Sequence, residues 1–501
     1  MLHDIYSGFL LCLRLDVFGY IGLGVILGVF VGALPGLTAA MTVAILLPVS
    51  FFIPPILGIP FLVALTKGAI YGGSIPAILI NTPGTGAAAA TTIDGYPLAK
   101  QGKARKALEM ALFASVAGDS FSDIVTLFGI GLLAKIALLI GSPEFFSIIL
   151  MSFMIIATLA GESMIKGLIS AFFGFFISTI GLDPLIGVRR FTFGLLDLTA
   201  GISMIPMIIG LFAIAEILRQ SERSLHNKES KVLRYQFQEE IAKGKREEKL
   251  TLKEFMESSR TILRSAVIGT GIGNIPGIGQ VVSSFLCYGI AKGRSKKPEM
   301  FGKGSLEGVA AAETGNNAVN GSSLMPLLVF GIPGDIVTAV LFSAFIVNGL
   351  RPGPRLFQTQ GPIIYGILWA LLLSNGVLLV LGKLALRYVA LIARFPGHVV
   401  FPSIASLCFV GAYSYNNSVF DVFLVLVFGA IGYVMQKFNF PIAPLLITFI
   451  LGPLFESALG QSLIMSDGSF MIFLTRPISL AFILVTPVIL ILLLRHLPKV
   501  D

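Results

Sequence analysis

The chain has 501 residues, of which 55% are hydrophobic and only 13% are charged, and its mean hydropathy is +0.89. This composition excludes a soluble globular protein, in which about a quarter of the residues are charged, and it predicts a multi-pass membrane protein. Much of the formal net charge of +9 comes from basic residues between Arg219 and Arg264. Such a cluster is typical of a cytoplasmic loop under the positive-inside rule, so we expect no nucleic-acid partner.

The first apolar stretch, with segments at 17–33 and 37–52, is interrupted by Pro35 and Gly36. Proline ends helical hydrogen bonding and glycine lets another group approach the backbone, so this break predicts a re-entrant helical hairpin. Three glycines spaced four residues apart lead into the break, a pattern typical of a close-packed helix interface. They are Gly24, Gly28 and Gly32.

A second break, at residues 81–85, follows an apolar run that contains Lys67. The next helix should open in the small residues 87–90, and its first backbone N–H groups have no intrahelical partner. These donors and the positive end of the helix dipole favour a bound anion. The side chains that add donors beside this helix end are Asn81, Thr82 and Thr85.

Four further crossings are expected at 107–140, 143–161, 162–182 and 195–218. An even number places the basic residues near Lys100 on the same side of the membrane as the basic loop, as the positive-inside rule requires. The first of these helices carries Asp119 and Asp123, which are costly in lipid. We expect both to pair with a lysine or arginine of a neighbouring helix, and a cation site is the alternative.

The first break recurs in the second half at residues 273–278, between segments 262–275 and 278–291. Basic residues flank both ends of this second hairpin, whereas the flanks of the first hairpin carry almost no charge. The two hairpins are therefore predicted to enter the membrane from opposite sides. This asymmetry favours two inverted repeats related by a pseudo-twofold axis in the membrane plane.

The second break recurs as well. Pro76 and Pro83 lie seven positions apart, and so do Pro326 and Pro333 in the second half. Further spans are expected at 362–386, 396–416, 417–438, 440–465 and 478–497. The predicted fold is therefore all-α and polytopic, with about 10 to 12 membrane segments, Pro-Gly-broken helices and re-entrant hairpins. Its parts are a first repeat at 1–218, a basic cytoplasmic linker with an amphipathic helix at 219–261, and a second repeat at 262–501 that ends in the cytoplasm.

A run of amide side chains precedes the second break of the second half. Asn316 and Asn320 share one helix face, and Glu313 lies one turn earlier. Amides amid alanines are costly in lipid unless they bond a partner helix or a ligand. Both roles remain open for this run.

Two matched pairs of broken helices are the sequence pattern of a secondary transporter's binding site. If the second breaks of both halves meet near the midplane, two helix N-termini face one cavity suited to carboxylates, with freed carbonyls left to hold Na⁺. The alternative is that the Pro-Gly pairs only kink helices for packing. The predicted substrate-binding residues are Asn81, Thr82, Pro83, Gly84, Thr85, Asn316, Asn317, Gly331, Pro333 and Gly334. The predicted cation-binding residues are Gly32, Pro35, Gly36, Gly273, Asn274, Pro276 and Gly277.

Over most of its length the sequence resembles the large membrane subunit of tripartite tricarboxylate transporters, the TctA family. The resemblance rests on the blocks 32–37, 71–84, 87–97, 180–184, 190–194, 307–317 and 331–334. It implies an uptake system of the bacterial inner membrane, driven by Na⁺ or H⁺, with a small membrane subunit and a periplasmic binding protein that delivers citrate or a related carboxylate. The alternative is an organic-anion channel, or a symporter for another carboxylate that works without a binding protein. No hydrolase, metalloprotease or Walker motif occurs, so we expect no enzyme, no cofactor and no metal other than Na⁺.

Overall fold

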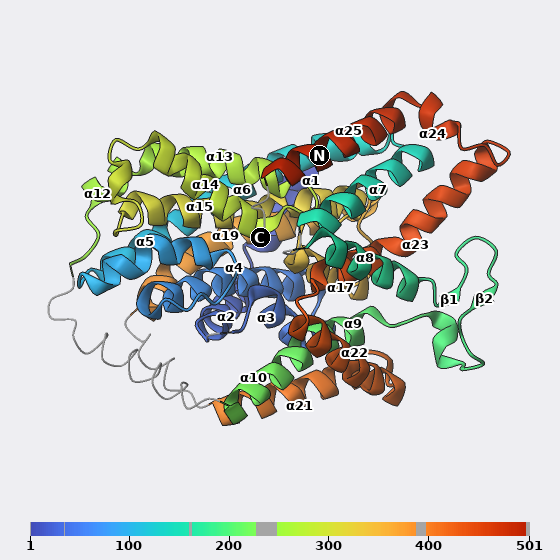
Figure 1. The fold of residues 1–501 in the computed structure, drawn as a ribbon, viewed down its shortest axis with the longest axis horizontal. Helices are drawn as coiled ribbons and strands as arrows, with labels where there is room; N and C mark the ends of the chain where they lie inside the picture. Colours follow the sequence, from blue (N-terminus) through green and yellow to red (C-terminus); the bar gives the residue numbers. More distant parts are fainter. Residues whose placement is uncertain (1, 35, 160–162, 227–247, 387–396, 497–501) are drawn as a thin grey trace.

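The computed structural model describes residues 2–34, 36–159, 163–226, 248–386 and 397–496. These residues are helical throughout apart from loops and one two-stranded antiparallel sheet (Figure 1). Seven of the described helices are long and apolar enough to cross a membrane, and five shorter apolar helices accompany them. The prediction of an all-α polytopic membrane protein is therefore confirmed.

The elements of the first half surround the two Pro-Gly breaks. They are α1 (Leu2–Cys12), α2 (Leu15–Gly32), α3 (Ala39–Leu46), η1 (Leu47–Phe52), α4 (Pro55–Ile80), α5 (Ala88–Lys100), α6 (Ala104–Ala137), α7 (Ser142–Leu159), α8 (Met164–Ser178), β1 (Gly181–Leu182), β2 (Arg189–Arg190), η2 (Asp197–Ala200), α9 (Met204–Ile208), the π-helical turn η3 (Ile209–Ile214) and α10 (Ala215–His226).

The elements of the second half surround breaks after α13 and after α16. They are α12 (Leu252–Glu257), α13 (Ser259–Gly273), α14 (Gly279–Arg294), η4 (Pro298–Met300), α15 (Leu306–Ser322), α16 (Leu324–Phe330), α17 (Ile336–Val347), α18 (Leu356–Thr359), α19 (Gly361–Ala385), α21 (Gly397–Asn416), α22 (Val419–Lys437), α23 (Ile442–Met465), α24 (Ile472–Thr475) and α25 (Pro477–His496).

The glycine stripe of α2 packs directly on α4, as predicted. A Cβ atom placed at Gly28 would lie 2.2 Å from the carbonyl oxygen of Leu65, and Gly24 and Gly32 meet the backbone of α4 equally closely. In the second half, Gly273 of α13 meets the carbonyl oxygen of Val319 on α15 in the same way, at 2.8 Å. In each half, a helix that leads into the first break therefore lies in backbone contact with the helix that leads into the second.

The start of the predicted crossing at 195–218 is wrong. The helix that is long enough to span a membrane begins at Met204. Before it, β1 and β2 form a short hairpin that projects at the right-hand edge of Figure 1. Backbone conformation explains the difference, since Gly194 and Gly201 both have positive φ and interrupt any continuous helix. Arg190 of this hairpin forms an ion pair with Glu456 of α23.

The deepest ion pair lies between α4 and α6, where Lys67 contacts Asp119 and Asp123. The Lys67 ammonium donates to Asp123, and its nitrogen lies 3.6 Å from Asp119 Oδ1. Asn375 of α19 completes the cluster by donating to Asp123 at 2.7 Å. The side chains of Lys67 and both aspartates are almost or fully inaccessible to solvent. The prediction that these aspartates pair with a basic residue of a neighbouring helix is confirmed.

We expect the Lys67→Met substitution to destabilise the protein by about 3 to 5 kcal/mol, because it leaves two buried carboxylates without their ammonium partner. Thermal unfolding of the purified protein in detergent measures the change. Lys135→Met is the matched control, since Lys135 lies on α6 with an exposed side chain. Equal unfolding temperatures for the two variants would contradict the expectation.

We expect Gly28→Ala to destabilise the α2–α4 contact by about 1 to 3 kcal/mol, since the added methyl group would have to displace backbone. Gly22→Ala on the same helix is the control, because a Cβ there meets nothing within 4 Å. The measurement is again the unfolding temperature in detergent. A Gly28→Ala protein as stable as the Gly22→Ala protein would show that the contact is loose.

Candidate binding site at four broken helices

The second breaks of the two halves have matching backbone conformations. Asn81 and Gly331, 250 positions apart, both end a helix in the left-handed region, at φ 55° and 70°. In both halves the next residue donates its N–H at 3.2 Å to the carbonyl oxygen of the preceding proline, Pro76 or Pro326. The repeat recognised in the sequence is therefore a repeat of local structure.

Each second break also packs against the first break of its own half. A Cβ atom at Gly84 would lie 2.8 Å from the carbonyl oxygen of Gly32, and one at Gly334 would lie 3.2 Å from that of Gly273. The N–H of Gly277 donates to the carbonyl oxygen of Gly334 at 2.7 Å. Only residues without a side chain allow this approach, which brings the two breaks of a half together.

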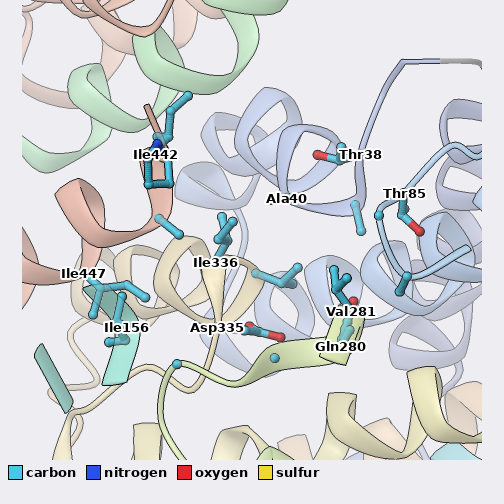
Figure 2. A pocket seen from close by; sticks show the side chains of 18 of the residues that line it. Thr38, Ala40, Thr85, Ile156, Gln280, Val281, Asp335, Ile336, Ile442 and Ile447 are labelled. Carbon is cyan, nitrogen blue, oxygen red and sulfur yellow. The ribbon is translucent and has the colours of Figure 1, made fainter. Parts of the chain in front are cut away.

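Four helices begin at one cavity of about 580 Å³, a volume typical of a small-molecule site. They are α3, α5, α14 and α17, the helices that follow the four breaks. Figure 2 shows one polar side chain near each of these helix starts, namely Thr38, Thr85, Gln280 and Asp335. The rest of the wall is mostly apolar and comes from α7, η3, α22 and the start of α23, through Ile156, Phe212, Gln436, Phe440, Pro441, Ile442, Ala443 and Ile447.

Three of the four helix starts are capped by their own side chains. Thr38 accepts a hydrogen bond from the N–H of Met41 at 3.3 Å, and Thr85 accepts one from Ala88 at 3.2 Å. Asp335 accepts from the N–H of Thr338 in the same way, at 2.8 Å. The fourth helix, α14, has no side-chain cap, so its first N–H groups remain available to a ligand.

Gln280 lies in the first turn of α14 and lines the cavity. Its amide nitrogen is buried and has no hydrogen-bond partner. A buried donor without a partner costs free energy unless water or a ligand accepts its hydrogen bond. Gln280 and the uncapped N-terminus of α14 therefore lie together in the wall of the same cavity, although the Gln280 amide nitrogen itself is inaccessible in this structure.

Among the described residues, the cavity lining includes no lysine or arginine. Its one ionisable side chain is Asp335, the counterpart of Thr85 at a distance of 250 positions. The two halves thus contribute a neutral cap and an acidic cap at equivalent positions. The cavity combines donors for an anion with one carboxylate that favours a cation.

The predicted site residues lie at different distances from this cavity. Thr85 and Gly277 line it, and Asp335 follows the predicted residue Gly334 directly. Asn274 instead lines a second cavity, of about 430 Å³, between α6 and α16. Pro35 lies outside the described residues. The remaining predicted residues do not line the larger cavity, although those in the breaks adjoin it in sequence; they are Gly32, Gly36, Asn81, Thr82, Pro83, Gly84, Gly273, Pro276, Asn316, Asn317, Gly331, Pro333 and Gly334.

The amide run of α15 lies inside the helix bundle. Glu313 accepts hydrogen bonds from Ser74 of α4, Thr91 of α5 and Ser115 of α6, and is fully buried. Asn317 donates to Ser115 Oγ and to the carbonyl oxygen of Glu313, each at 2.9 Å. These bonds tie together four helices, and a substrate role for Asn317 stays a prediction.

Sequence reasoning did not select Thr38, Gln280 or Asp335 as site residues. A usable signal existed, because each lies one to three positions after the Pro-Gly pair of its break. The apolar wall had no such signal, since Ile156, Phe212 and Phe440 come from helices without any break.

Comparison with known proteins gives a consistent result. The family described as "Tripartite tricarboxylate transporter TctA family" matches residues 18–447. An Agrobacterium vitis protein named "Uncharacterized 52.8 kDa protein in TAR-I ttuC' 3'region" is 35% identical over 466 residues, covering 92% of this chain and 90% of its own length.

A second protein of the same organism, "Uncharacterized protein in TAR-II ttuC' 3'region", is 38% identical over 211 residues, covering 42% of this chain and 87% of its own. No solved structure matches this chain. The family match and the alignment with the first relative both extend over most of the chain. The sequence blocks that carry the resemblance, from residue 32 to residue 334, lie within the family match. The chain belongs to the tripartite tricarboxylate transporter TctA family and is a multi-pass membrane component of a tricarboxylate transport system.

Proposed function

We propose that the cavity between the four helix starts binds a tricarboxylate such as citrate, or a related organic acid, during cation-coupled uptake. The observation that carries the proposal is the convergence of the N-termini of α3, α5, α14 and α17 on one cavity. Each N-terminus contributes a partial positive charge, and the uncapped start of α14 also contributes available N–H groups, which together favour carboxylates. Because the lining has no lysine or arginine, these backbone groups and Gln280 are its principal donors.

The coupling ion is proposed to be Na⁺ or H⁺. Asp335 places a carboxylate in the lining, where it would repel a polyanionic substrate unless a cation accompanied that substrate. Carbonyl groups freed at the breaks near Gly32, Gly36, Gly273 and Gly277 are the proposed Na⁺ ligands, as in other transporters built from broken helices. A cation and a carboxylate bound together would keep the net charge of the cavity low.

The proposed architecture is a pair of inverted repeats, each with a re-entrant hairpin, at α2–α3 and α13–α14. The matched φ angles of Asn81 and Gly331 and the matched proline-carbonyl hydrogen bonds support a structural repeat. The unequal charge of the hairpin flanks, which are basic in the second half and nearly uncharged in the first, supports the inversion. In the proposed orientation, in the bacterial inner membrane, the 219–261 linker and the C-terminus are cytoplasmic; residues 227–247 of that linker lie outside the described residues.

The partners proposed for the chain are a small membrane subunit and a periplasmic solute-binding protein. The family description itself names a tripartite transporter, which supports two further components. The binding protein would deliver the carboxylate to the cavity.

The decisive test is uptake by the purified subunits in liposomes, with the binding protein outside and radiolabelled citrate as the first carboxylate of a panel. Uptake that requires an inward Na⁺ or H⁺ gradient, and accumulates citrate against its own gradient, is the expected result. Flux that persists without either gradient and only equilibrates citrate would support the channel alternative. Full uptake without the binding protein would support the symporter that works alone.

We expect Gln280→Ala to raise the KM for the transported carboxylate about tenfold or more, because a hydrogen bond to a charged group contributes about 1.5 to 3 kcal/mol. Initial uptake rates against substrate concentration give the value. Gln358→Ala is the matched control, since Gln358 is exposed and lies outside the cavity. An unchanged KM in the Gln280→Ala protein would remove this residue from the proposed site.

A further inference from the structure

The buried cluster of Lys67, Asp119 and Asp123 contains two carboxylates and one ammonium group. If all three are ionised, the cluster carries a net charge of −1. Lys67 and Asp119 are fully buried, and only 2% of Asp123 is exposed. An uncompensated charge at such a position is costly in a membrane protein, so the cluster requires one additional positive charge.

The hydrogen bonds of Lys67 show which carboxylate lacks compensation. An ammonium group has three N–H donors, and here they go to Asp123 Oδ2, to Asn375 Oδ1 at 2.7 Å and to the carbonyl oxygen of Leu371 at 3.1 Å. Asp123 receives a further hydrogen bond from the Asn375 amide. No donor of Lys67 is left for Asp119, and neither carboxylate oxygen of Asp119 has a hydrogen-bond partner.

Another fully buried carboxylate of this helix bundle is arranged differently. Glu313 on α15 accepts hydrogen bonds from the hydroxyl groups of Ser74, Thr91 and Ser115, which stabilise it as an anion. Asp119 has no such donors and is fully buried as well. The contrast identifies Asp119 as the carboxyl group in this bundle whose neutral form fits its surroundings better.

Other titratable side chains of the packed helices lie outside this cluster. Among the described residues, Lys67 is the one basic side chain within 4.0 Å of Asp119 or Asp123. On α15, the amide of Asn320 interacts with Asp119, although no hydrogen bond of ordinary geometry joins the two side chains. The remaining titratable groups on the helices packed against α6 are Tyr71 on α4, Asp94, Tyr96 and Lys100 on α5, Arg260 and Arg264 on α13, Glu307 and Glu313 on α15, and Tyr365 and Lys383 on α19; on α6 itself they are Arg105, Lys106, Glu109 and Lys135.

We propose that Asp119 is a proton-binding residue of the transporter, and that its proton is released and regained during transport. The protonated Asp119 makes the cluster neutral, and release of H⁺ leaves a carboxylate and a net charge of −1 while Lys67 stays charged. A proton fits better than Na⁺ because neither aspartate lines the two cavities described above, and Na⁺ needs space for a shell of oxygen ligands. The inference rests on the proposed cation-coupled function and names its coupling ion.

The position of the cluster links protonation to the broken helices. Lys67 lies on α4, which ends at the second break of the first half, and α6 packs along both α4 and α15. Asn320 lies on α15, which leads through α16 into the second break of the second half. A change of charge at Asp119 would therefore act on the helices that carry both halves of the cavity.

The first experiment follows protonation without any substrate. Infrared difference spectra of the purified protein, recorded during a pH titration, report the C=O stretch of protonated carboxylic acids. We expect a band that titrates in the wild-type protein, is absent in Asp119→Asn and is retained in Asp421→Asn, where the substituted aspartate is buried in the first turn of α22 instead. A spectrum without a titrating carboxyl band, or one unchanged in Asp119→Asn, would overturn the proposal.

The second experiment measures coupling in liposomes that contain the membrane subunits, the binding protein and a pH-sensitive dye. Wild-type and Asp421→Asn proteins should move protons with labelled citrate, whereas Asp119→Asn should exchange citrate across the membrane without proton movement. Asp119→Glu should restore proton movement. The proposed site is supported if Asp119→Asn exchanges citrate as fast as the wild-type protein but moves no protons. Undiminished proton movement in that variant overturns the proposal.

The two experiments separate the inference from the function on which it rests. If citrate and the other carboxylates of the panel are not transported by any variant while the Asp119 band titrates, the proposed function fails and the proton site stands. If transport is driven by Na⁺ alone and the band does not titrate, the function stands and the proton site fails. A folding defect is excluded when Asp119→Asn and Asp421→Asn unfold at the same temperature.

Discussion

The organisation of this protein depends on one constraint, which is that backbone groups freed by a break in a membrane helix cannot bond to lipid. The chain contains four Pro-Gly breaks, and the helices that follow them all begin at one cavity. Freed N–H groups are satisfied by Thr38, Thr85 and Asp335 at three helix starts and are left available at α14. A requirement of backbone hydrogen bonding thereby places the polar groups of the bundle around one space.

Close backbone contact makes this arrangement compact. Gly28 and its neighbours bring α2 against α4, and Gly84 and Gly334 bring each second break against the first break of its half. Hydrophobic burial gives little drive for helix association inside a bilayer, so packing of small residues and interhelical hydrogen bonds hold such bundles together. The bonds from Ser74, Thr91 and Ser115 to Glu313 serve this purpose beside the glycine contacts. The rigid central bundle is thus built from the same helices that carry the breaks.

The sequence predicted those features that depend on local chemistry. Proline and glycine spacing located all four breaks, the glycine stripe predicted a close-packed helix interface without naming its partner α4, and the cost of buried charge predicted a basic partner for Asp119 and Asp123. The cavity wall could not be predicted, because Ile156, Phe212 and Phe440 reach it only through the packing of helices far apart in the chain. The start of the helix at Met204 was misplaced for a related reason, since the apolar sequence before it folds as a hairpin and loop that positive-φ glycines permit.

The cavity and the buried Lys67 cluster lie at separate places in the fold, and each has an unbalanced set of polar or charged groups. Their separation bears on transport. The cavity offers donors without any basic side chain, so an anion there is held by helix dipoles whose partial charges do not change with pH. The cluster at Lys67 contains two carboxylates but only one ammonium group, and none of its side chains lines the cavity. Its charge can therefore change without displacing a ligand from the cavity. A protein that kept both functions in one pocket would bind its proton and its substrate in competition for the same donors. With the proposed proton-binding group on α6, in contact with the helices that lead to the second breaks, protonation would alter helix packing while the proposed anion site kept its donors.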